Sequence, residues 1–244
     1  MHYYGGKYKS GKDISNILKS ITNEIKIKGY IEPFCGALGV MRHMTNNYFK
    51  CYAFDGCEDI ILLWKSVQNN KFKKPNITKN KWLELKKTNK PSALRAYAGF
   101  GLSYGGRWFS AYSQDYFDRT LTKRNQNDES YNSINNKIKN NINNVIFEHR
   151  DYKNHLKDIE KGGYLIYCDP PYVNSFEKHK GSKHKFDCKE FWDIIKKWKN
   201  WGNIIVVSER KAPKEYKCIW SKKIYNSSTN KSNETYTDKL YINI

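Results

Sequence analysis

The chain contains 244 residues, with 44 Lys and Arg against 24 Asp and Glu, and its formal net charge is +20. This length suits one large domain, or a core domain with one sizeable insertion, and no stretch approaches the ~20 apolar residues that a membrane-spanning helix needs. The positive charge favours a polyanionic partner such as nucleic acid, although an AT-rich gene that over-uses Lys and Asn would explain part of it.

The six cysteines disfavour two further classes of protein. They form no Cys-x-x-Cys pair and have no His-rich companion spacing. Several lie in apolar runs, so they indicate buried thiols rather than a disulfide framework or a zinc site. The N-terminal residues contain no apolar signal segment. We therefore expect a cytoplasmic protein that uses no metal and no membrane.

Short apolar runs alternate with helical patterns along most of the chain. The apolar runs predict seven strands, at residues 30–34, 51–54, 145–148, 164–168, 203–208, 217–221 and 239–242. Four helices are predicted at residues 13–26, 38–46, 58–67 and 188–199, and the last follows Asp187, with Glu190 at capping-box spacing. Such alternation is typical of βαβ units, so we expect an α/β fold with a mainly parallel sheet.

The alternation breaks between about Lys71 and Asn144. This stretch is rich in Lys, Asn, Gly and aromatic residues, and it is too long for a loop between adjacent strands of a compact domain. We interpret residues 71–144 as an inserted subdomain, in a main domain formed by residues 1–70 and 145–244.

The tetrapeptide Asp169-Pro170-Pro171-Tyr172 directly follows the predicted strand at 164–168. In open α/β sheets the ligand crevice lies at the carboxyl ends of the strands, and the tetrapeptide occupies such an end. The two prolines fix the backbone and remove two donors. Asp169 and the Pro170 carbonyl could each accept one N–H of an exocyclic amine, while Tyr172 stacks on a flipped-out base. The alternative is a proline-rich turn without a chemical role.

Two further features suit a nucleotide-containing ligand. Glycines after the first predicted strand, beginning at Gly36, allow backbone amides to approach a cofactor closely. Asp55 ends the second predicted strand, where nucleotide-binding folds place an acidic residue against ribose hydroxyls. An ordinary loop would also contain such residues, and Lys7 could be a solvated side chain.

The order of these motifs is typical of one enzyme family. DPPY after a strand resembles the catalytic motif of amino-group DNA methyltransferases, and the chain resembles the Dam-type adenine-N6 group, which includes phage and bacterial members. The matching segments run from residue 3 to about residue 213: Tyr3-Tyr4-Gly5-Gly6-Lys7, Glu32-Pro33-Phe34-Cys35-Gly36, Asp55-Gly56-Cys57-Glu58-Asp59, and residues 99–109, 145–152 and 208–213. Each match is short, and DPPY in this context is the most specific.

The resemblance implies a Rossmann-like class I methyltransferase sheet that uses S-adenosyl-L-methionine to methylate a flipped-out adenine in double-stranded DNA by direct transfer. The catalytic residues would be Asp169, Pro170, Pro171 and Tyr172. The cofactor-binding residues would be Tyr3, Lys7, Glu32, Phe34, Gly36, Asp55, Asp151, Tyr152 and Asp169. A partner restriction enzyme or an orphan role, a monomer or a homodimer, and a virus or phage source all remain open.

The family inserts its target-recognition domain where residues 71–144 interrupt the chain, so this subdomain would be mainly helical and would bind DNA. The candidate DNA-binding residues are Lys71, Lys73, Lys74, Arg107 and Arg124. All five could neutralise phosphates, and the two arginines could also read guanine edges. A lysine run of this kind is more often a solvated face.

One position departs from the family pattern. Leu38 stands where the family has the second glycine of its cofactor loop, and glycine follows one residue later at Gly39. Two alternatives to an active adenine-N6 enzyme therefore stay open. The chain could methylate cytosine N4 or adenine in RNA, or it could be a degenerate, non-catalytic DNA-binding protein.

Overall fold

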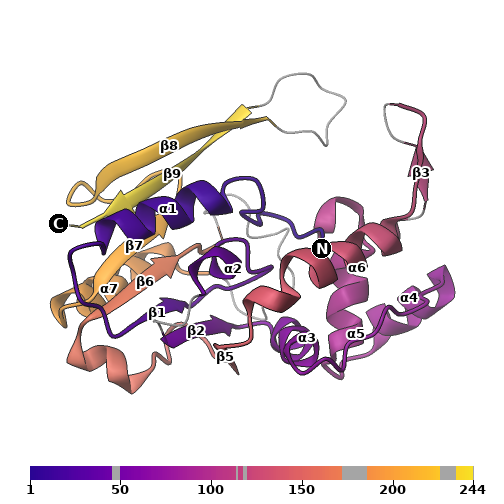
Figure 1. The fold of residues 1–244 in the computed structure, drawn as a ribbon, viewed down its shortest axis with the longest axis horizontal. Coiled ribbons are helices and arrows are strands. Elements are labelled where there is room, and N and C mark those ends of the chain that lie inside the picture. Colours follow the sequence, from indigo (N-terminus) through magenta and orange to yellow (C-terminus); the bar gives the residue numbers. More distant parts are fainter. Residues whose placement is uncertain (46–49, 114, 118–119, 172–185, 226–234, 244) are drawn as a thin grey trace.

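The computed structural model describes residues 1–45, 50–113, 115–117, 120–171, 186–225 and 235–243 (Figure 1). Seven strands form one sheet in the order β5-β2-β1-β6-β7-β9-β8. Their bounds are β1 Gly29–Glu32, β2 Lys50–Asp55, β5 Val145–His149, β6 Tyr164–Cys168, β7 Ile204–Ser208, β8 Lys217–Tyr225 and β9 Thr235–Ile242. The seven strands that the apolar runs predict are all present.

The strand order reverses next to β1. From β1 the chain adds β2 and then β5 on one side, and it returns to the other side of β1 with β6 and then β7, all parallel. β9 then runs antiparallel to both β7 and β8. Such a reversal is where open α/β sheets form their ligand crevice, outside the carboxyl ends of the strands. The expected Rossmann-like sheet is confirmed, and its switch point lies between β1 and β6.

Helices cover both faces of the sheet. On one face, α1 (Gly11–Ile21), α2 (Met41–Met44) and α3 (Glu58–Gln68) pack on a core that includes Tyr30, Leu165 and Val206. On the other face, α7 (Cys188–Asn200) and the 3₁₀ turn η4 (Lys157–Lys161) cover Ile31, Ile166 and Ile205. Because successive residues of a strand point to opposite faces, burial on both faces explains why the strands are nearly continuous apolar runs.

The insertion is mainly helical, as expected. It contains α4 (Lys79–Lys87), α5 (Ala93–Ala96), a π-helical turn η1 (Tyr97–Gly101), a 3₁₀ turn η2 (Tyr104–Gly106), α6 (Gln126–Lys137) and the 3₁₀ turn η3 (Lys139–Asn141), besides a short hairpin of β3 (Tyr116–Phe117) and β4 (Lys123–Arg124). Figure 1 shows these helices gathered with α3 at one end of the molecule, with the hairpin projecting from them.

The insertion shares its core with the main domain. Trp82, Tyr97 and Ile134 belong to the same cluster of buried residues as α3 and the sheet. The carboxylate of Asp59 in α3 also binds the Arg95 guanidinium at 2.6 Å and accepts the backbone N–H of Ser92 at 2.8 Å. Residues 71–144 are therefore joined to α3 by packing and by an ion pair.

Two helix predictions are wrong at their ends. The helix predicted at 13–26 begins at Gly11 and ends at Ile21, after which Thr22 turns its hydroxyl back to the Leu18 carbonyl. The helix predicted at 38–46 covers only Met41–Met44. Leu38 has φ 57°, a left-handed conformation that no α-helix contains, and residue 46 lies outside the described residues.

The start of α7 agrees with its prediction. The Asp187 carboxylate accepts the backbone N–H of Glu190 at 3.0 Å, as an N-cap should. The Glu190 side chain does not return to the cap, because it binds the ammonium of Lys153 instead. The sequence therefore predicts the cap correctly, while the second half of the capping box is wrong.

Candidate active site

The predicted motifs leave the sheet side by side. In β1 and β6, Tyr30 pairs with Leu165 and Ile31 with Ile166. The segment after Glu32 and the segment beginning at Asp169 therefore emerge from neighbouring strands at the switch point. The structure describes Asp169, Pro170 and Pro171 of the DPPY motif, whereas Tyr172 lies outside the described residues.

A buried ion pair joins the N-terminal motif to the DPPY motif. The Lys7 Nζ lies 2.8 Å from the Asp169 Oδ1, and the two side chains are 5 % and 18 % exposed. The carboxylate of Asp238, in β9, lies 3.9 Å from the same ammonium and accepts the Ser10 hydroxyl at 3.2 Å. The N-terminal segment therefore crosses the carboxyl ends of the strands and brings one cation to the predicted acceptor carboxylate.

Several buried carboxyls lie around Asp169. Burial and, to a smaller extent, the charge of Asp238 raise the pKa of Asp169 to about 6 against the lowering effect of Lys7. Burial also raises the pKa of Glu209 to about 7 and that of Glu32 to about 8. The Tyr30 hydroxyl donates to Glu32 at 2.6 Å. The described part of the site is therefore rich in acceptor oxygens.

Sequence reasoning missed two members of this group. Glu209 directly follows β7, so its place at the carboxyl end of a parallel strand was a usable signal. Asp238 lies within an antiparallel strand, and no local pattern connects it with Lys7. Both are 4 % exposed.

The glycine loop after β1 is fixed by hydrogen bonds. The two oxygens of Asp55 accept the backbone N–H groups of Gly36 and Cys57, each at 2.9 Å. The indole of Trp64 donates to the Gly36 carbonyl at 2.8 Å. Gly36 has φ 42°, and a Cβ there would lie 3.0 Å from the Tyr3 ring. The structure thus brings together Tyr3, Gly36 and Asp55, three of the predicted cofactor-binding residues.

Leu38 and Gly39 each show one feature typical of glycine: Leu38 has a left-handed backbone, and Gly39 lies against a neighbouring segment. Leu38 is fully buried in the left-handed conformation that favours glycine. At Gly39 a Cβ would lie 3.0–3.1 Å from the backbone of Lys7, and a Cβ on Gly11 would lie 2.0 Å from the Gly39 carbonyl oxygen. Gly39 therefore permits the close approach of the segment that carries Lys7.

Asp151 and Tyr152 follow β5 and lie near the carboxyl ends of β1 and β2. The Arg150 N–H donates to the Asp55 carbonyl at 3.1 Å, which places Asp151 just beyond Asp55. The Tyr152 ring is 5.1 Å from that of Phe34. Tyr152 is 8 % exposed, and its buried hydroxyl has no hydrogen-bond partner among the described residues.

These donors and acceptors suit an adenosine-containing cofactor. Asp55 offers carboxylate oxygens at the place for ribose hydroxyls, and Asp151 offers another on the neighbouring strand end. Phe34 and Tyr152 provide aromatic surface beside them. Glu32 is buried and bound to Tyr30, so it lies beneath the loop.

A comparison with family models decides the class of protein. The model described as D12 class N6 adenine-specific DNA methyltransferase matches residues 3–93 and 108–239. The chain belongs to this family. Among curated proteins, the search found no match. The resemblance to Dam-type adenine methyltransferases is confirmed, and a DNA adenine methyltransferase is favoured over the cytosine and RNA alternatives.

The family match omits residues 94–107, which include η1 and η2. This segment packs on the N-terminal motif of this D12 methyltransferase. Tyr4 donates its N–H to the Gly106 carbonyl at 3.0 Å, and a Cβ on Gly106 would lie 2.5 Å from the Tyr3 nitrogen. The Arg107 guanidinium lies 4.8 Å from the Tyr4 ring centre, and its buried Nε has no hydrogen-bond partner among the described residues. Arg107 therefore lies where the insertion meets the N-terminal segment.

The other DNA-binding candidates lie at the surface of the insertion. Lys71 and Lys73 are exposed, while Lys74 forms an ion pair with Asp128. Arg124 is exposed in β4, 3.7 Å from a Glu129 oxygen. The sequence did not predict the β3–β4 hairpin itself. Its Phe117 and Leu121 are 67 % and 81 % exposed.

Neither a metal-binding group nor a membrane-spanning helix is present in the described part of the chain. No group of three or more His, Cys, Asp or Glu side chains there could hold a metal ion. Among the same residues, no helix is long and apolar enough to cross a membrane.

Proposed function

We propose that this D12 methyltransferase is an active DNA adenine-N6 methyltransferase that uses S-adenosyl-L-methionine. The observation that carries the proposal is the Lys7–Asp169 ion pair at the switch point, directly before Pro170 and Pro171. An acceptor carboxylate paired with a lysine, at the carboxyl end of a parallel strand, suits an amine substrate beside a nucleotide cofactor.

The proposed chemistry depends on Asp169 and the Pro170 carbonyl. The adenine amine is a poor nucleophile because its lone pair is delocalised into the ring. Lys7 occupies Oδ1 of Asp169, so we assign Oδ2 and the Pro170 carbonyl to the two N–H groups of the amine. Accepting both favours a pyramidal nitrogen whose lone pair points at the methyl donor. A carboxyl with a pKa of about 6 is also basic enough to take the proton that the nitrogen releases.

S-adenosyl-L-methionine supplies an electrophilic sulfonium methyl group when bound. We assign Asp55 to its ribose hydroxyls, Asp151 to its adenine amine, and Phe34 and Tyr152 to the surface against the adenine ring. Tyr3 packs against Gly36, whose N–H donates to Asp55. Tyr172 is assigned to stacking on the flipped target base, which a duplex otherwise keeps out of reach.

We assign target recognition to residues 71–144. The β3–β4 hairpin projects from the helices (Figure 1) and exposes the apolar Phe117 and Leu121 beside the cations of Lys123 and Arg124. Apolar side chains beside basic ones suit a nucleic-acid groove, where cations neutralise phosphates and apolar groups contact bases. Lys71 and Lys73 would add further phosphate contacts.

The decisive experiment is nucleoside analysis after methylation. Plasmid DNA is incubated with the protein and labelled S-adenosyl-L-methionine, digested to nucleosides and separated. We expect the label in N6-methyladenine. Label in N4-methylcytosine would overturn the acceptor, and methylation of RNA alone would overturn the substrate.

Leu38 supports one second candidate, a non-catalytic DNA-binding protein, because its left-handed backbone lies in the cofactor loop. Calorimetric titration with S-adenosyl-L-methionine separates the two candidates. The wild-type protein should bind the cofactor, and Asp55→Ala should bind it roughly ten- to a hundredfold more weakly, since a charged hydrogen-bond partner is lost. A wild-type protein that binds DNA but no cofactor would favour the second candidate.

A further inference from the structure

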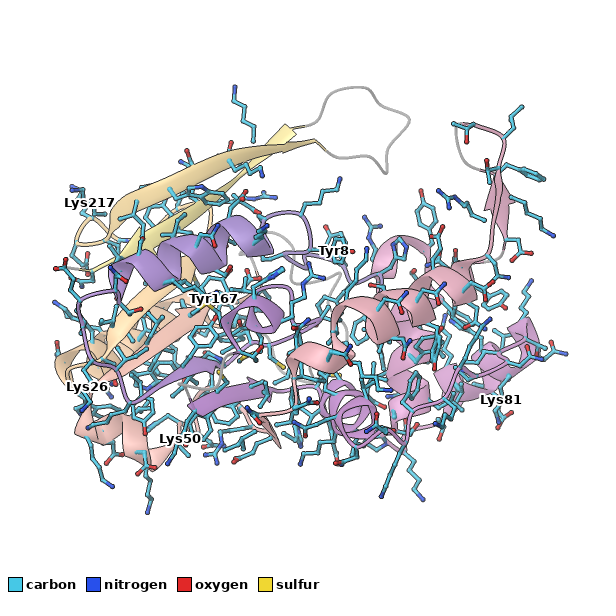
Figure 2. All side chains as sticks on the ribbon, viewed as in Figure 1. Tyr8, Lys26, Lys50, Lys81, Tyr167 and Lys217 are labelled. Carbon is cyan, nitrogen blue, oxygen red and sulfur yellow. The ribbon has the colours of Figure 1, made fainter. Side chains whose placement is uncertain are left out.

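A basic cluster lies directly beside the acidic site. It is formed by Tyr8 and the cations around it, and we call it the Tyr8 patch; its members are Tyr8, Lys12, Lys19, Arg42, His43 and Lys137. The cations come from α1, α2 and the last residue of α6, so the patch joins the main domain to the insertion. In Figure 2, Tyr8 lies between α1 and α6.

Two cations lie against the Tyr8 ring. The Arg42 guanidinium lies 4.4 Å from the centre of its ring, and the Lys137 ammonium lies 5.0 Å from it and also donates to the phenol oxygen. Arg42 donates further to the Tyr8 carbonyl at 3.3 Å and to the His43 ring at 3.1 Å. Arg42 is only 9 % exposed, whereas Tyr8 is 44 % exposed. Tyr8 and Lys137 are therefore accessible to solvent, while the charge of Arg42 is buried beside them.

No carboxylate balances this charge in the described part of the chain. Lys12, Lys19, Arg42 and Lys137 form no ion pair with any described Asp or Glu, and Lys19 binds only the His43 carbonyl, at 2.6 Å. Burial and the charges of Arg42, Lys19 and Lys12 lower the pKa of His43. Partial burial alone would raise the pKa of Tyr8, but its hydrogen bonds with Lys137 and Arg42 lower it. Neighbouring cations therefore lower the pKa of both His43 and Tyr8.

Gathering cations without a counterion is unfavourable, and a buried charge is normally paired. Tyr8 follows Lys7, whose ammonium contacts the acceptor carboxylate, so a duplex with its base at Asp169 must pass close to the patch. We propose that the Tyr8 patch binds a backbone phosphate of the DNA next to the target adenine. Tyr8 and Lys137 make the contact, and Arg42 supplies fixed charge behind the ring. Such a contact positions the duplex without reading its sequence.

This inference rests on DNA being the substrate, and DNA binding tests it separately from catalysis. The variant is Lys137→Gln, and the matched control is Lys196→Gln, an exposed lysine of α7 on the opposite face of the sheet. Affinity for a short duplex is measured between about 50 and 200 mM salt. We expect Lys137→Gln to weaken binding severalfold and to reduce the salt slope by about 0.9, one phosphate contact, while the control changes neither.

Kinetics and a second variant sharpen the test. Lys137→Gln should raise KM for DNA and leave kcat at saturating DNA unchanged, because the contact is equal in the ground and transition states. Tyr8→Phe keeps the ring for Arg42 and removes only the hydroxyl, so it should weaken binding in the same direction. Lys137→Arg, which keeps the positive charge, should bind DNA with near wild-type affinity.

Each opposing outcome has a defined meaning. A Lys137→Gln variant that binds and responds to salt like the control would overturn the patch while leaving methylation intact. Free inorganic phosphate would be the occupant if it bound the wild-type protein more strongly than chloride did at equal ionic strength while Lys137→Gln left the salt dependence of DNA affinity unchanged. That pair of results would overturn DNA as the occupant. A wild-type protein that binds DNA with the expected slope but methylates nothing would instead contradict the proposed function.

Discussion

Lys7 and Tyr8 are consecutive residues, yet they lie in opposite electrostatic surroundings. Lys7 brings its cation to the carboxyls of Asp169 and Asp238, and its side chain is almost fully buried. Tyr8 lies among cations that form no ion pair with a described carboxylate, and it is 44 % exposed. One segment therefore divides an acidic, buried site from a basic, exposed one.

The difference corresponds to two tasks of a DNA methyltransferase. An amine needs acceptor oxygens at the reacting atom, and these are worth most where water is excluded. A phosphate needs cations at the surface, where they attract DNA and are screened by salt. If this division is correct, changes on the Lys7 side should alter the reaction and its pH dependence, and changes on the Tyr8 side should alter DNA affinity and its salt dependence.

The largest effect is expected for Asp169→Ala. This variant removes the acceptor at the reacting nitrogen, and losing such a hydrogen bond costs ~10²-fold or more in kcat. Rates are measured with saturating DNA and cofactor, and cofactor affinity by calorimetry should change much less. Near wild-type turnover would remove Asp169 from the reaction and leave the acidic side without a role.

Lys7→Met should produce the next largest effect. The charge of Lys7 lowers the pKa of Asp169, which burial raises to about 6. The reaction needs the carboxylate form, so the wild-type rate should rise with pH through about 6. Without Lys7 the pKa rises further, and the acid limb of the kcat profile should move to higher pH with roughly tenfold loss below it, since one pKa unit is a factor of ten. Lys9→Met, an exposed neighbour, is the control. An unmoved acid limb would separate Lys7 from Asp169.

Folding stability tests whether the buried carboxyls are as crowded as the geometry indicates. The folded pKa of Glu32, about 8, is raised above its unfolded value, so the folded state binds the extra proton. That group therefore stabilises the fold at low pH and loses this contribution as pH rises from about 4.5 to 8. Glu32→Gln keeps an acceptor for Tyr30 and removes the titration. Its free energy of unfolding, relative to wild type, should increase with pH by at most ~1.4 kcal/mol per unit.

Urea unfolding across that pH range measures the effect, with the exposed Glu24→Gln as control. A difference between Glu32→Gln and wild type that stays constant with pH would mean that Glu32 does not titrate within the window.

The strands were predictable because their physical cause is local. Parallel strands buried on both faces become continuous apolar runs, and residues 164–168 were predicted with both ends correct. Thr78 and Asn125 also cap α4 and α6 in the insertion, so these two helix starts carried a signal that the sequence interpretation did not use.

The arrangement of charges was not predictable in the same way. Lys7, Asp169 and Asp238 are brought together by strand order, and no periodicity relates residues so far apart in the chain. Resemblance named Lys7 and Asp169 separately, while Asp238 had no signal. Leu38 was recognised as a departure, but its left-handed backbone and the compensating approach at Gly39 depend on the tertiary fold.

The smallest predicted effect is also the most specific. Asp238 faces Asp169 across Lys7, and its charge raises the pKa of Asp169. Asp238→Asn keeps an acceptor for the Ser10 hydroxyl and removes that charge. The acid limb of kcat should therefore move to lower pH, by less than the opposite shift expected for Lys7→Met, with the plateau unchanged. Glu32 and Glu209 also face Asp169, but both are still present in this variant.

Asp13→Asn on α1 is the matched control, since it removes one carboxylate that pairs with Lys222 away from the site. Lys7→Met and Asp238→Asn then shift the same titration in opposite directions, which a general loss of stability would not do. A shift of the Asp238→Asn limb to higher pH would mean that Asp238 acts mainly by holding Lys7 against Asp169. In that case the position of Lys7, rather than the sum of the charges around Asp169, would set the pKa of Asp169.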